Sequence, residues 1–259
     1  MELLQLSSQI ILYLLVFCRI SGFVMACPLT RDWLPRSARI LLALGLSVTT
    51  LVQLWPDAGH GNDLELSLNL VITACSEFFL GMLLGVVPLL YFSVFSLAGH
   101  MTGLQMALGF AELNDPANGV SVTVVAHIYQ VMAQFLFVLI NGHLLLFTVL
   151  LDSFSALPTG QFLSVIDRTA ALLAMVGWLF GAGLLIALPA VITLLIVNLT
   201  FGFMTRSAPQ INLLTLGFPM IILVGIALLS LNIQKLPDTV RQHSQYAIHV
   251  LGSLIQGTP

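Results

Sequence analysis

The stretch LSLNLVITACSEFFLGMLLGVVPLLYFSVFSLAGHMTGLQMALG (residues 66–109) decides the fold class, because its only Asp, Glu, Lys or Arg residue is Glu77. As a single α-helix, these 44 residues would extend about 66 Å, whereas the hydrocarbon core of a bilayer is about 30 Å thick. We therefore expect a helix that bends, turns back or extends beyond the bilayer. Pro88 and the glycines Gly99, Gly103 and Gly109 are the candidate break points.

The whole chain shares this apolar character. Of its 259 residues, 58% are hydrophobic and 7% are charged, whereas soluble domains carry about 25% charged residues. Such hydrophobicity excludes intrinsic disorder, and a formal net charge of -3 argues against a basic nucleic-acid-binding surface. The composition predicts an all-α integral membrane protein with room for roughly six or seven crossings of about 20 residues each.

Further apolar segments at 3–29, 40–55, 120–151, 169–205 and 213–234 are joined by short polar connections. The connection that contains Arg31, Arg36 and Arg39 is the most basic, which favours a cytoplasmic position. The tail from Lys235 onward is more polar, but its apolar residues have the spacing of a weak amphipathic helix. These residues are Val240, Ala247, Val250, Leu251 and Leu254.

Motifs for catalysis or metal binding are missing from the sequence. It contains no HExxH pair, no CxxC pair and no P-loop, and the three cysteines are widely spaced. His100, His127 and His143 lie too far apart to share a helical turn, so each is expected to be hydrogen-bonded between helices. We predict no catalytic residue, no cofactor and no metal ion, and therefore no enzyme.

Ionisable and strongly polar residues inside apolar segments are costly and deserve a hypothesis each. Arg19, Glu77, Asn141 and His143 are the main ones. Glu77 is interpreted as the partner of an arginine in helix packing. The competing interpretation is a small-molecule or ion transporter, in which Glu77, Asp115 and a histidine would bind the cargo.

Residues 109–119, GFAELNDPANG, combine helix-breaking and polar residues. One interpretation is an interfacial turn, in which Asp115-Pro116 caps and starts a helix. The other is a re-entrant loop, since irregular backbone at membrane depth is tolerated only where it lines a cavity or is buried in protein. The residues alone leave both interpretations open.

Five separate blocks of the chain resemble the FliR family of the bacterial flagellar export gate, called SctT in virulence type III secretion. The blocks are Arg19, Gly22, Pro28, Pro35 and Arg39; Glu77, Gly81 and Gly85; Gly109-Phe110-Ala111 with Asp115-Pro116; Asn141-Gly142-His143-Leu144; and Arg206, Ala208-Pro209, Asn212 and Gly217-Phe218-Pro219. They occur in order over nearly the whole chain.

The resemblance implies a pore-forming subunit organised as one domain over residues 1–259. Residues 1–170 would be a FliP-like portion, 171–235 a FliQ-like hairpin and 236–259 a polar tail. One such subunit would assemble with several FliP and FliQ homologues in the bacterial inner membrane, at the flagellar basal body, beside FlhB and FlhA homologues. Unfolded flagellar proteins would pass through this assembly.

The resemblance also assigns roles to particular residues. Gly109, Phe110, Ala111, Asp115 and Pro116 would form a plug in the closed channel, where Glu112 departs from the family pattern. Met101 and Met106 would lie near the constriction, because flexible Met side chains can repack around a varying substrate, but ordinary helix packing is the favoured explanation for both. A cytoplasmic turn would contain the family positions Arg206, Pro209, Asn212, Gly217 and Pro219.

Overall fold

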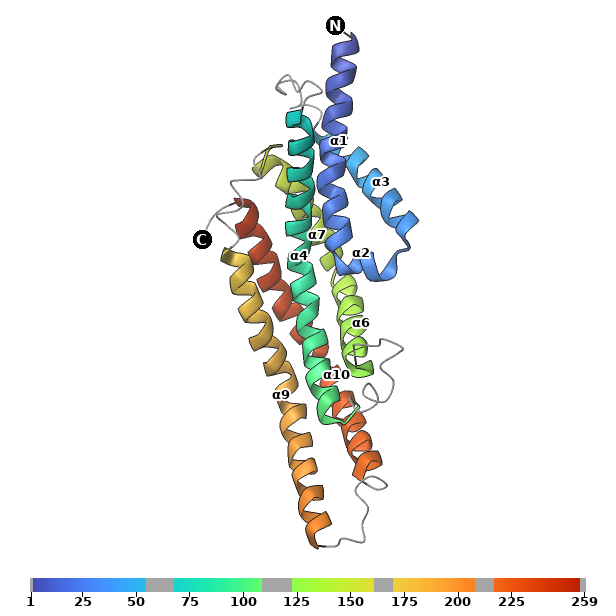
Figure 1. The fold of residues 1–259 in the computed structure, drawn as a ribbon, viewed down its shortest axis with the longest axis vertical. Coiled ribbons are helices and arrows are strands. Elements are labelled where there is room, and N and C mark those ends of the chain that lie inside the picture. Colours follow the sequence, from blue (N-terminus) through green and yellow to red (C-terminus); the bar gives the residue numbers. More distant parts are fainter. Residues whose placement is uncertain (1, 55–67, 109–122, 161–169, 208–216, 257–259) are drawn as a thin grey trace. The chain divides into compact units, whose positions relative to one another are not determined.

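The computed structural model describes residues 2–54, 68–108, 123–160, 170–207 and 217–256, and every regular element among them is an α-helix (Figure 1). The expectation of an all-α chain is confirmed. The helices are α1 (Glu2–Ala26), α2 (Pro28–Trp33), α3 (Arg36–Leu54), α4 (Leu68–Gln105), α6 (Val124–Leu139), α7 (Gly142–Ala156), α9 (Ala170–Ser207) and α10 (Phe218–Gln256).

Four of the described helices, α1, α4, α9 and α10, are long and apolar enough to cross a membrane. The broken pair α6 and α7 is a fifth candidate if it counts as one span. α4 and α9 each contain 38 residues, which corresponds to about 57 Å of helix against a hydrocarbon core of about 30 Å. These helices therefore exceed what one perpendicular crossing requires.

The chain forms two compact units. Unit 1 contains Met1–Leu90, Gly142–Met175 and Tyr246–Pro259, and unit 2 contains Tyr91–Asn141 and Val176–Gln245. The long helices α4, α9 and α10 each contribute residues to both units.

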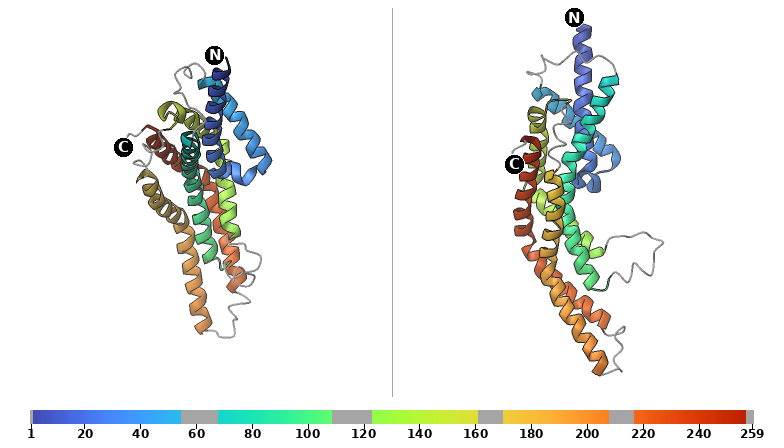
Figure 2. Two further views of the ribbon diagram at one scale, coloured as in Figure 1. Left: turned by 45° about the horizontal axis from the view of Figure 1, so that its top comes forward. Right: turned by 60° about the vertical axis from the view of Figure 1, so that its left-hand side comes forward.

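Unit 1 depends on a close contact between α1 and α4, which lie side by side in both views of Figure 2. A methyl group added at Gly81 of α4 would overlap the main-chain carbonyl oxygen of Arg19 on α1. A methyl group at Gly22 of α1 would likewise overlap the carbonyl oxygen of Phe78. Glycine at these positions lets the two backbones approach within direct contact, as small residues do in membrane helix pairs.

α3 also contacts α1, and its buried side consists of small residues. Ala43, Ser47 and Thr50 are at most 2% exposed. Ser47 and Thr50 satisfy their hydroxyl groups within the helix, by donating to the carbonyl oxygens of Ala43 at 2.6 Å and Leu46 at 2.7 Å. The large apolar side chains of α3 therefore lie on its outer, exposed side.

Unit 2 is built around the second part of α4. A methyl group at Gly99 would lie 2.5 Å from the Cα atom of Ala126 on α6, and one at Gly183 of α9 would lie 2.8 Å from Cδ2 of Leu97. Glycine on both sides therefore allows α6 and α9 to pack closely against α4. α9 and α10 also contact each other, because the rings of Trp178 and His243 lie 5.3 Å apart.

An aromatic cluster fills the interior of unit 2. The ring of Tyr91 lies 4.9 Å from that of Phe92, 5.5 Å from that of Phe95 and 5.4 Å from that of Phe137. The hydroxyl group of Tyr91 donates a hydrogen bond to the carbonyl oxygen of Val240 at 3.0 Å. This bond satisfies the one polar atom of a ring that is otherwise buried among apolar groups.

The ends of the helices differ in part from the sequence prediction. α4 runs without interruption from Leu68 to Gln105, so the chain does not turn back at Pro88 or Gly99. After the last helical residue, Gln105, Ala107 has a φ of 61° in the left-handed region, and Leu108 N–H donates to the carbonyl oxygen of Gly103. The predicted tail helix is the last part of α10, which continues through Pro237.

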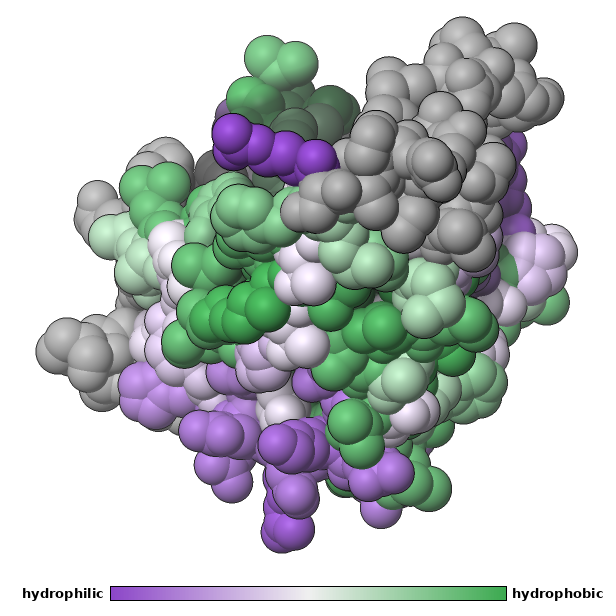
Figure 3. Space-filling view, turned by 90° about the horizontal axis from the view of Figure 1, so that it is seen from below, coloured by the Kyte–Doolittle hydropathy of each residue, from purple (hydrophilic) through white to green (hydrophobic). Residues whose placement is uncertain are grey.

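Large apolar side chains also cover the outside of the described helices. Only 28% of the candidate span in α9 is buried, and Leu173 and Leu185 of this helix are 73% and 70% exposed. Apolar areas, drawn in green, cover much of the face that Figure 3 presents. Apolar surface on this scale requires lipid or partner chains around it.

The α1–α4 contact yields a prediction about Gly81. We expect Gly81→Ala to lower the free energy of unfolding by about 1–3 kcal/mol, because backbone rather than a flexible side chain has to move. Gly45→Ala in α3 is the matched control: no atom lies within 4 Å of the added methyl group, so stability should stay equal or rise by up to about 1 kcal/mol. Thermal melting in detergent measures both, and equal melting temperatures for the two variants would contradict the close contact.

Candidate functional site

Arg19 and Glu77 meet in the interior of unit 1. Both side chains are 0% exposed, and Nε of Arg19 donates a hydrogen bond to Oε2 of Glu77 at 2.6 Å. Arg19 comes from α1 and Glu77 from α4, next to the glycine contact of these helices. The structure thus pairs the carboxylate with an arginine, as the packing interpretation of Glu77 requires.

The remaining nitrogens of Arg19 bind main-chain oxygens. Nη1 donates to the carbonyl oxygen of Ser153 and Nη2 to that of Leu157, both at 2.9 Å. The guanidinium carbon also lies 4.3 Å from the ring centre of Phe154, a cation–π contact. Every nitrogen of the buried guanidinium group therefore has an acceptor.

The second carboxylate oxygen of Glu77 binds the turn after α7. Oε1 accepts a hydrogen bond from the main-chain N–H of Gly160 at 2.9 Å. Gly160 has a φ of 91°, a backbone conformation that favours glycine. We call Arg19, Glu77, Ser153, Leu157 and Gly160 the ion-pair junction.

The ion-pair junction joins three helices at the end of one of them. Ser153 and Leu157 lie at the C-terminal end of α7, where the carbonyl groups carry partial negative charge. A cation placed there is favourable, and the carboxylate of Glu77 compensates the remaining charge. Every nitrogen of Arg19 and both carboxylate oxygens of Glu77 take part in a hydrogen bond, so the junction joins the helices to one another.

Asn141 and His143 mark the break between α6 and α7. Asn141 is exposed and has a φ of 59°, which ends the continuous helical path. Nδ1 of His143 is covered by protein and has no hydrogen-bond partner among the described residues, unlike the expectation for this histidine. The side chain borders a cavity of about 30 Å³ that also contacts Cys27. Burial raises the pKa of Cys27 to about 11, so this thiol stays protonated at neutral pH.

The plug residues Gly109, Phe110, Ala111, Asp115 and Pro116 lie outside the described residues, but the segments that hold this loop are described. A methyl group at Gly103 of α4 would lie 2.9 Å from Oγ1 of Thr123. Thr123 caps α6, because its Oγ1 accepts a hydrogen bond from the N–H of Ala126 at 3.3 Å. The chain therefore enters and leaves the loop at neighbouring points.

The two candidate constriction residues differ in their surroundings. Met106 is 1% exposed, and its side chain fills the space above Gly225 of α10, where a methyl group would lie 2.5 Å from Cε of Met106. Met101 is half-buried in α4. Met106 is thus a packing residue within unit 2.

The residues of the predicted turn between α9 and α10 are described only in part. Arg206 is exposed in the last turn of α9, Gly217 is buried, and Pro219 is exposed in the first turn of α10. Pro209 and Asn212 lie outside the described residues.

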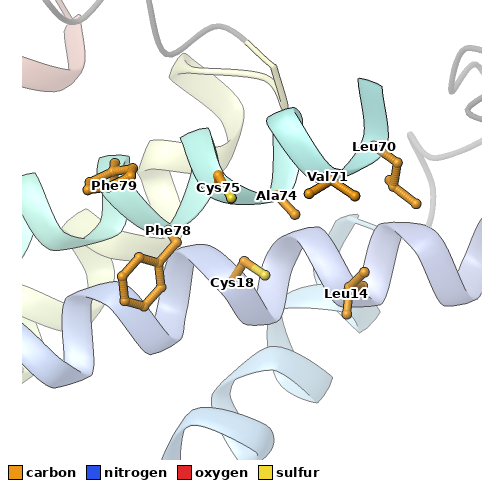
Figure 4. A pocket seen from close by; sticks show the side chains of 8 residues that line it. All are labelled: Leu14, Cys18, Leu70, Val71, Ala74, Cys75, Phe78 and Phe79. Carbon is orange, nitrogen blue, oxygen red and sulfur yellow. The ribbon is translucent and has the colours of Figure 1, made fainter. Parts of the chain in front are cut away.

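A groove of about 490 Å³ follows the contact between α1 and α4 (Figure 4). Its lining is apolar apart from two thiols, those of Cys18 and Cys75, and Figure 4 shows that these come from the two facing helices. Within the described part of the chain, no group of three or more His, Cys, Asp or Glu residues could hold a metal ion. The groove is therefore suited to apolar contacts.

Sequence reasoning missed the partners of the ion pair. Ser153, Phe154 and Leu157 carry no distinctive pattern, and they are 134 or more positions away from Arg19. The available signal was Pro158-Thr159-Gly160, a turn sequence with a glycine after an apolar helix.

The ion-pair junction yields a prediction about Arg19. Arg19→Met leaves the buried carboxylate of Glu77 without its cation, and breaking such a pair costs about 3–5 kcal/mol. Arg19→Lys should fall between Arg19→Met and the wild type, because an ammonium group keeps the charge but lacks the fork of donors. Arg241→Met, at an exposed position of α10, is the control and should change stability by less than about 0.5 kcal/mol. If Arg19→Met melts in detergent at the wild-type temperature, the junction does not hold unit 1 together.

Comparisons with known proteins identify the family of the chain. Residues 10–247 match the family described as Bacterial export proteins, family 1. The chain is 32% identical to the flagellar biosynthetic protein FliR of Escherichia coli over 85% of this chain and 83% of that protein. It is 33% identical to FliR of Pectobacterium carotovorum over 85% and 84%, and 26% identical to FliR of Aquifex aeolicus over 95% of each chain. The chain belongs to the FliR family of bacterial export proteins.

Proposed function

We propose that this chain is an inner-membrane subunit of the flagellar protein export gate. It assembles with several copies of FliP and FliQ homologues, beside FlhB and FlhA homologues, into a pore for unfolded flagellar proteins. Membership in the FliR family supports the assignment to flagellar export. The observation that carries the assembly is the outward apolar surface of helices that are longer than a bilayer crossing, as on α9 and α10.

The proposal divides the chain as the family resemblance implies. Residues 1–170 act as the FliP-like portion, and residues 171–235 act as the FliQ-like hairpin. Trp178 of α9 lies against His243 of α10, which supports side-by-side packing of these two helices, although His243 itself belongs to the tail after residue 235. The outer side of the hairpin, with Leu185 and Leu223 exposed by 70% and 61%, then packs against neighbouring subunits.

The loop after α4 is proposed to plug the closed channel. Gly109, Phe110, Ala111, Asp115 and Pro116 would occupy the pore, with Met101 near the constriction. The contact between Gly103 and Thr123 supports this role, because it holds both ends of the loop together as one hinge point. Met106, packed on Gly225, would stabilise this base instead of contacting the substrate.

A solute transporter finds less support. In such a protein Glu77 would bind the cargo, but both of its oxygens already accept hydrogen bonds, from Arg19 and from Gly160. The larger groove that we describe has an apolar lining, which offers a polar solute no partner. The export-gate role is therefore the function that we propose.

Assembly is tested by co-expression of the tagged chain with the FliP and FliQ homologues of the same organism. The tag should recover a detergent-stable complex, and native mass spectrometry should count one copy of this chain with several copies of each partner. The FliP and FliQ homologues expressed without the chain serve as the control. Recovery of the chain alone, as a monodisperse protein that binds a defined solute, would contradict the proposal.

Replacement of residues 110–116 by a Gly-Ser linker of equal length tests the plug. We expect the assembled gate to leak ions, because a flexible polar linker cannot seal an apolar constriction. The same linker in place of residues 57–63, in another loop, is the matched control and should leave the membrane tight. Membrane conductance in cells that carry each complex provides the measurement, and equal conductance in a fully assembled 110–116 variant would rule out the plug role.

A further inference from the structure

Three of the eight Lys and Arg residues of the chain lie together at the elbow between α2 and α3 (Figure 1). These are Arg31 near the end of α2, and Arg36 and Arg39 in the first turn of α3. We call the segment from Arg31 to Arg39 the arginine elbow. Asp32 is its one acidic residue, and Oδ1 of Asp32 lies 3.3 Å from Nε of Arg31. The elbow therefore keeps an excess of two positive charges.

The position of Arg36 and Arg39 favours a negatively charged ligand nearby. The first N–H groups of a helix lack partners within it and carry partial positive charge, which disfavours cations in the first turn. α3 has no acidic residue in this turn to offset them. A negatively charged ligand beside this turn would therefore offset the charges of Arg36 and Arg39.

An apolar stripe begins directly beside the arginines. Ile40, Leu44, Val48 and Val52 follow one another four residues apart on one side of α3, and they are 57%, 36%, 51% and 69% exposed. The buried side of the same helix carries small residues, as described above. At the elbow, Trp33 is 45% exposed. This helix thus presents its largest apolar side chains outward.

We infer that the arginine elbow binds the head groups of anionic phospholipids, while the outer side of α3 lies among their acyl chains. A guanidinium group matches phosphate oxygens with two parallel hydrogen bonds. Arg39 and Ile40 are adjacent, which reproduces the immediate change from phosphate to hydrocarbon in a bilayer. Trp33 fits the interfacial layer, where tryptophan is enriched. An acidic protein would satisfy the arginines but offers no continuous apolar layer beside them. This lipid site does not depend on the export function.

Fluorescence of Trp33 tests the inference on the full chain. Trp55→Phe and Trp178→Phe together leave Trp33 as the only tryptophan. The protein is reconstituted in vesicles of phosphatidylcholine and phosphatidylglycerol, in which one lipid or the other carries brominated acyl chains at the same mole fraction. Brominated phosphatidylglycerol should quench Trp33 more strongly than brominated phosphatidylcholine. The association constant of phosphatidylglycerol at this site, relative to that of phosphatidylcholine, should rise about fivefold for each arginine that contacts a head group.

Charge removal supplies the decisive comparison. In the variant with Trp33 as its one tryptophan, Arg31→Gln, Arg36→Gln and Arg39→Gln together should make the association constants of the two lipids about equal. Arg206→Gln with Arg241→Gln removes two exposed arginines elsewhere and should keep the preference. Equal quenching by both lipids in the unaltered elbow would overturn the head-group site. Quenching by neither lipid would place Trp33 outside the bilayer and assign the surface to a protein partner, which would also overturn it.

Discussion

A buried arginine in an apolar protein needs acceptors for every nitrogen, and unit 1 is organised around that requirement. Arg19 finds its acceptors in Glu77 and in two buried carbonyl groups at the end of α7. The contact is short because Gly22 and Gly81 let α1 and α4 approach to backbone distance. Charge pairing and small residues are thus interdependent: larger side chains at the glycines would separate the ions, and loss of either ion would leave its partner buried and unpaired.

Large apolar side chains fill the interior of the described helices and also cover much of their outside. On α3, Ser47 and Thr50 face inward while Leu41 is 68% exposed, and on α9 most of the candidate span is exposed. In water this arrangement would expose the chain to aggregation, so its environment has to complete the structure. The basic elbow suits a lipid surface at α3. For α9, whose 38 residues exceed a bilayer crossing and carry no comparable cluster of arginines, we propose neighbouring subunits.

The sequence was sufficient for the fold class, because composition and long uncharged segments leave few alternatives to apolar helices. It also favoured an arginine partner for Glu77, since an unpaired buried carboxylate is costly. Other features were beyond its reach. Ser153 and Leu157 act through main-chain oxygens, which any residue type supplies. Just after the end of α4, Ala107 has a left-handed conformation where glycine is usual, so the sequence lacks the usual signal for the end of this helix. The apolar segment 213–234 and the tail from Lys235 were expected as separate segments, yet α10 is one helix from Phe218 to Gln256.

The central claim is that the outward apolar side of α9 is covered by other subunits in the working gate. A spin label at Leu185→Cys, in a chain whose three cysteines are replaced, reports contact with lipid through its relaxation by dissolved oxygen. The chain alone in a bilayer should show strong relaxation, and co-assembly with the FliP and FliQ homologues should reduce it to the level of a buried site. Equally strong relaxation before and after verified assembly would show that this face remains in lipid, and would contradict the account.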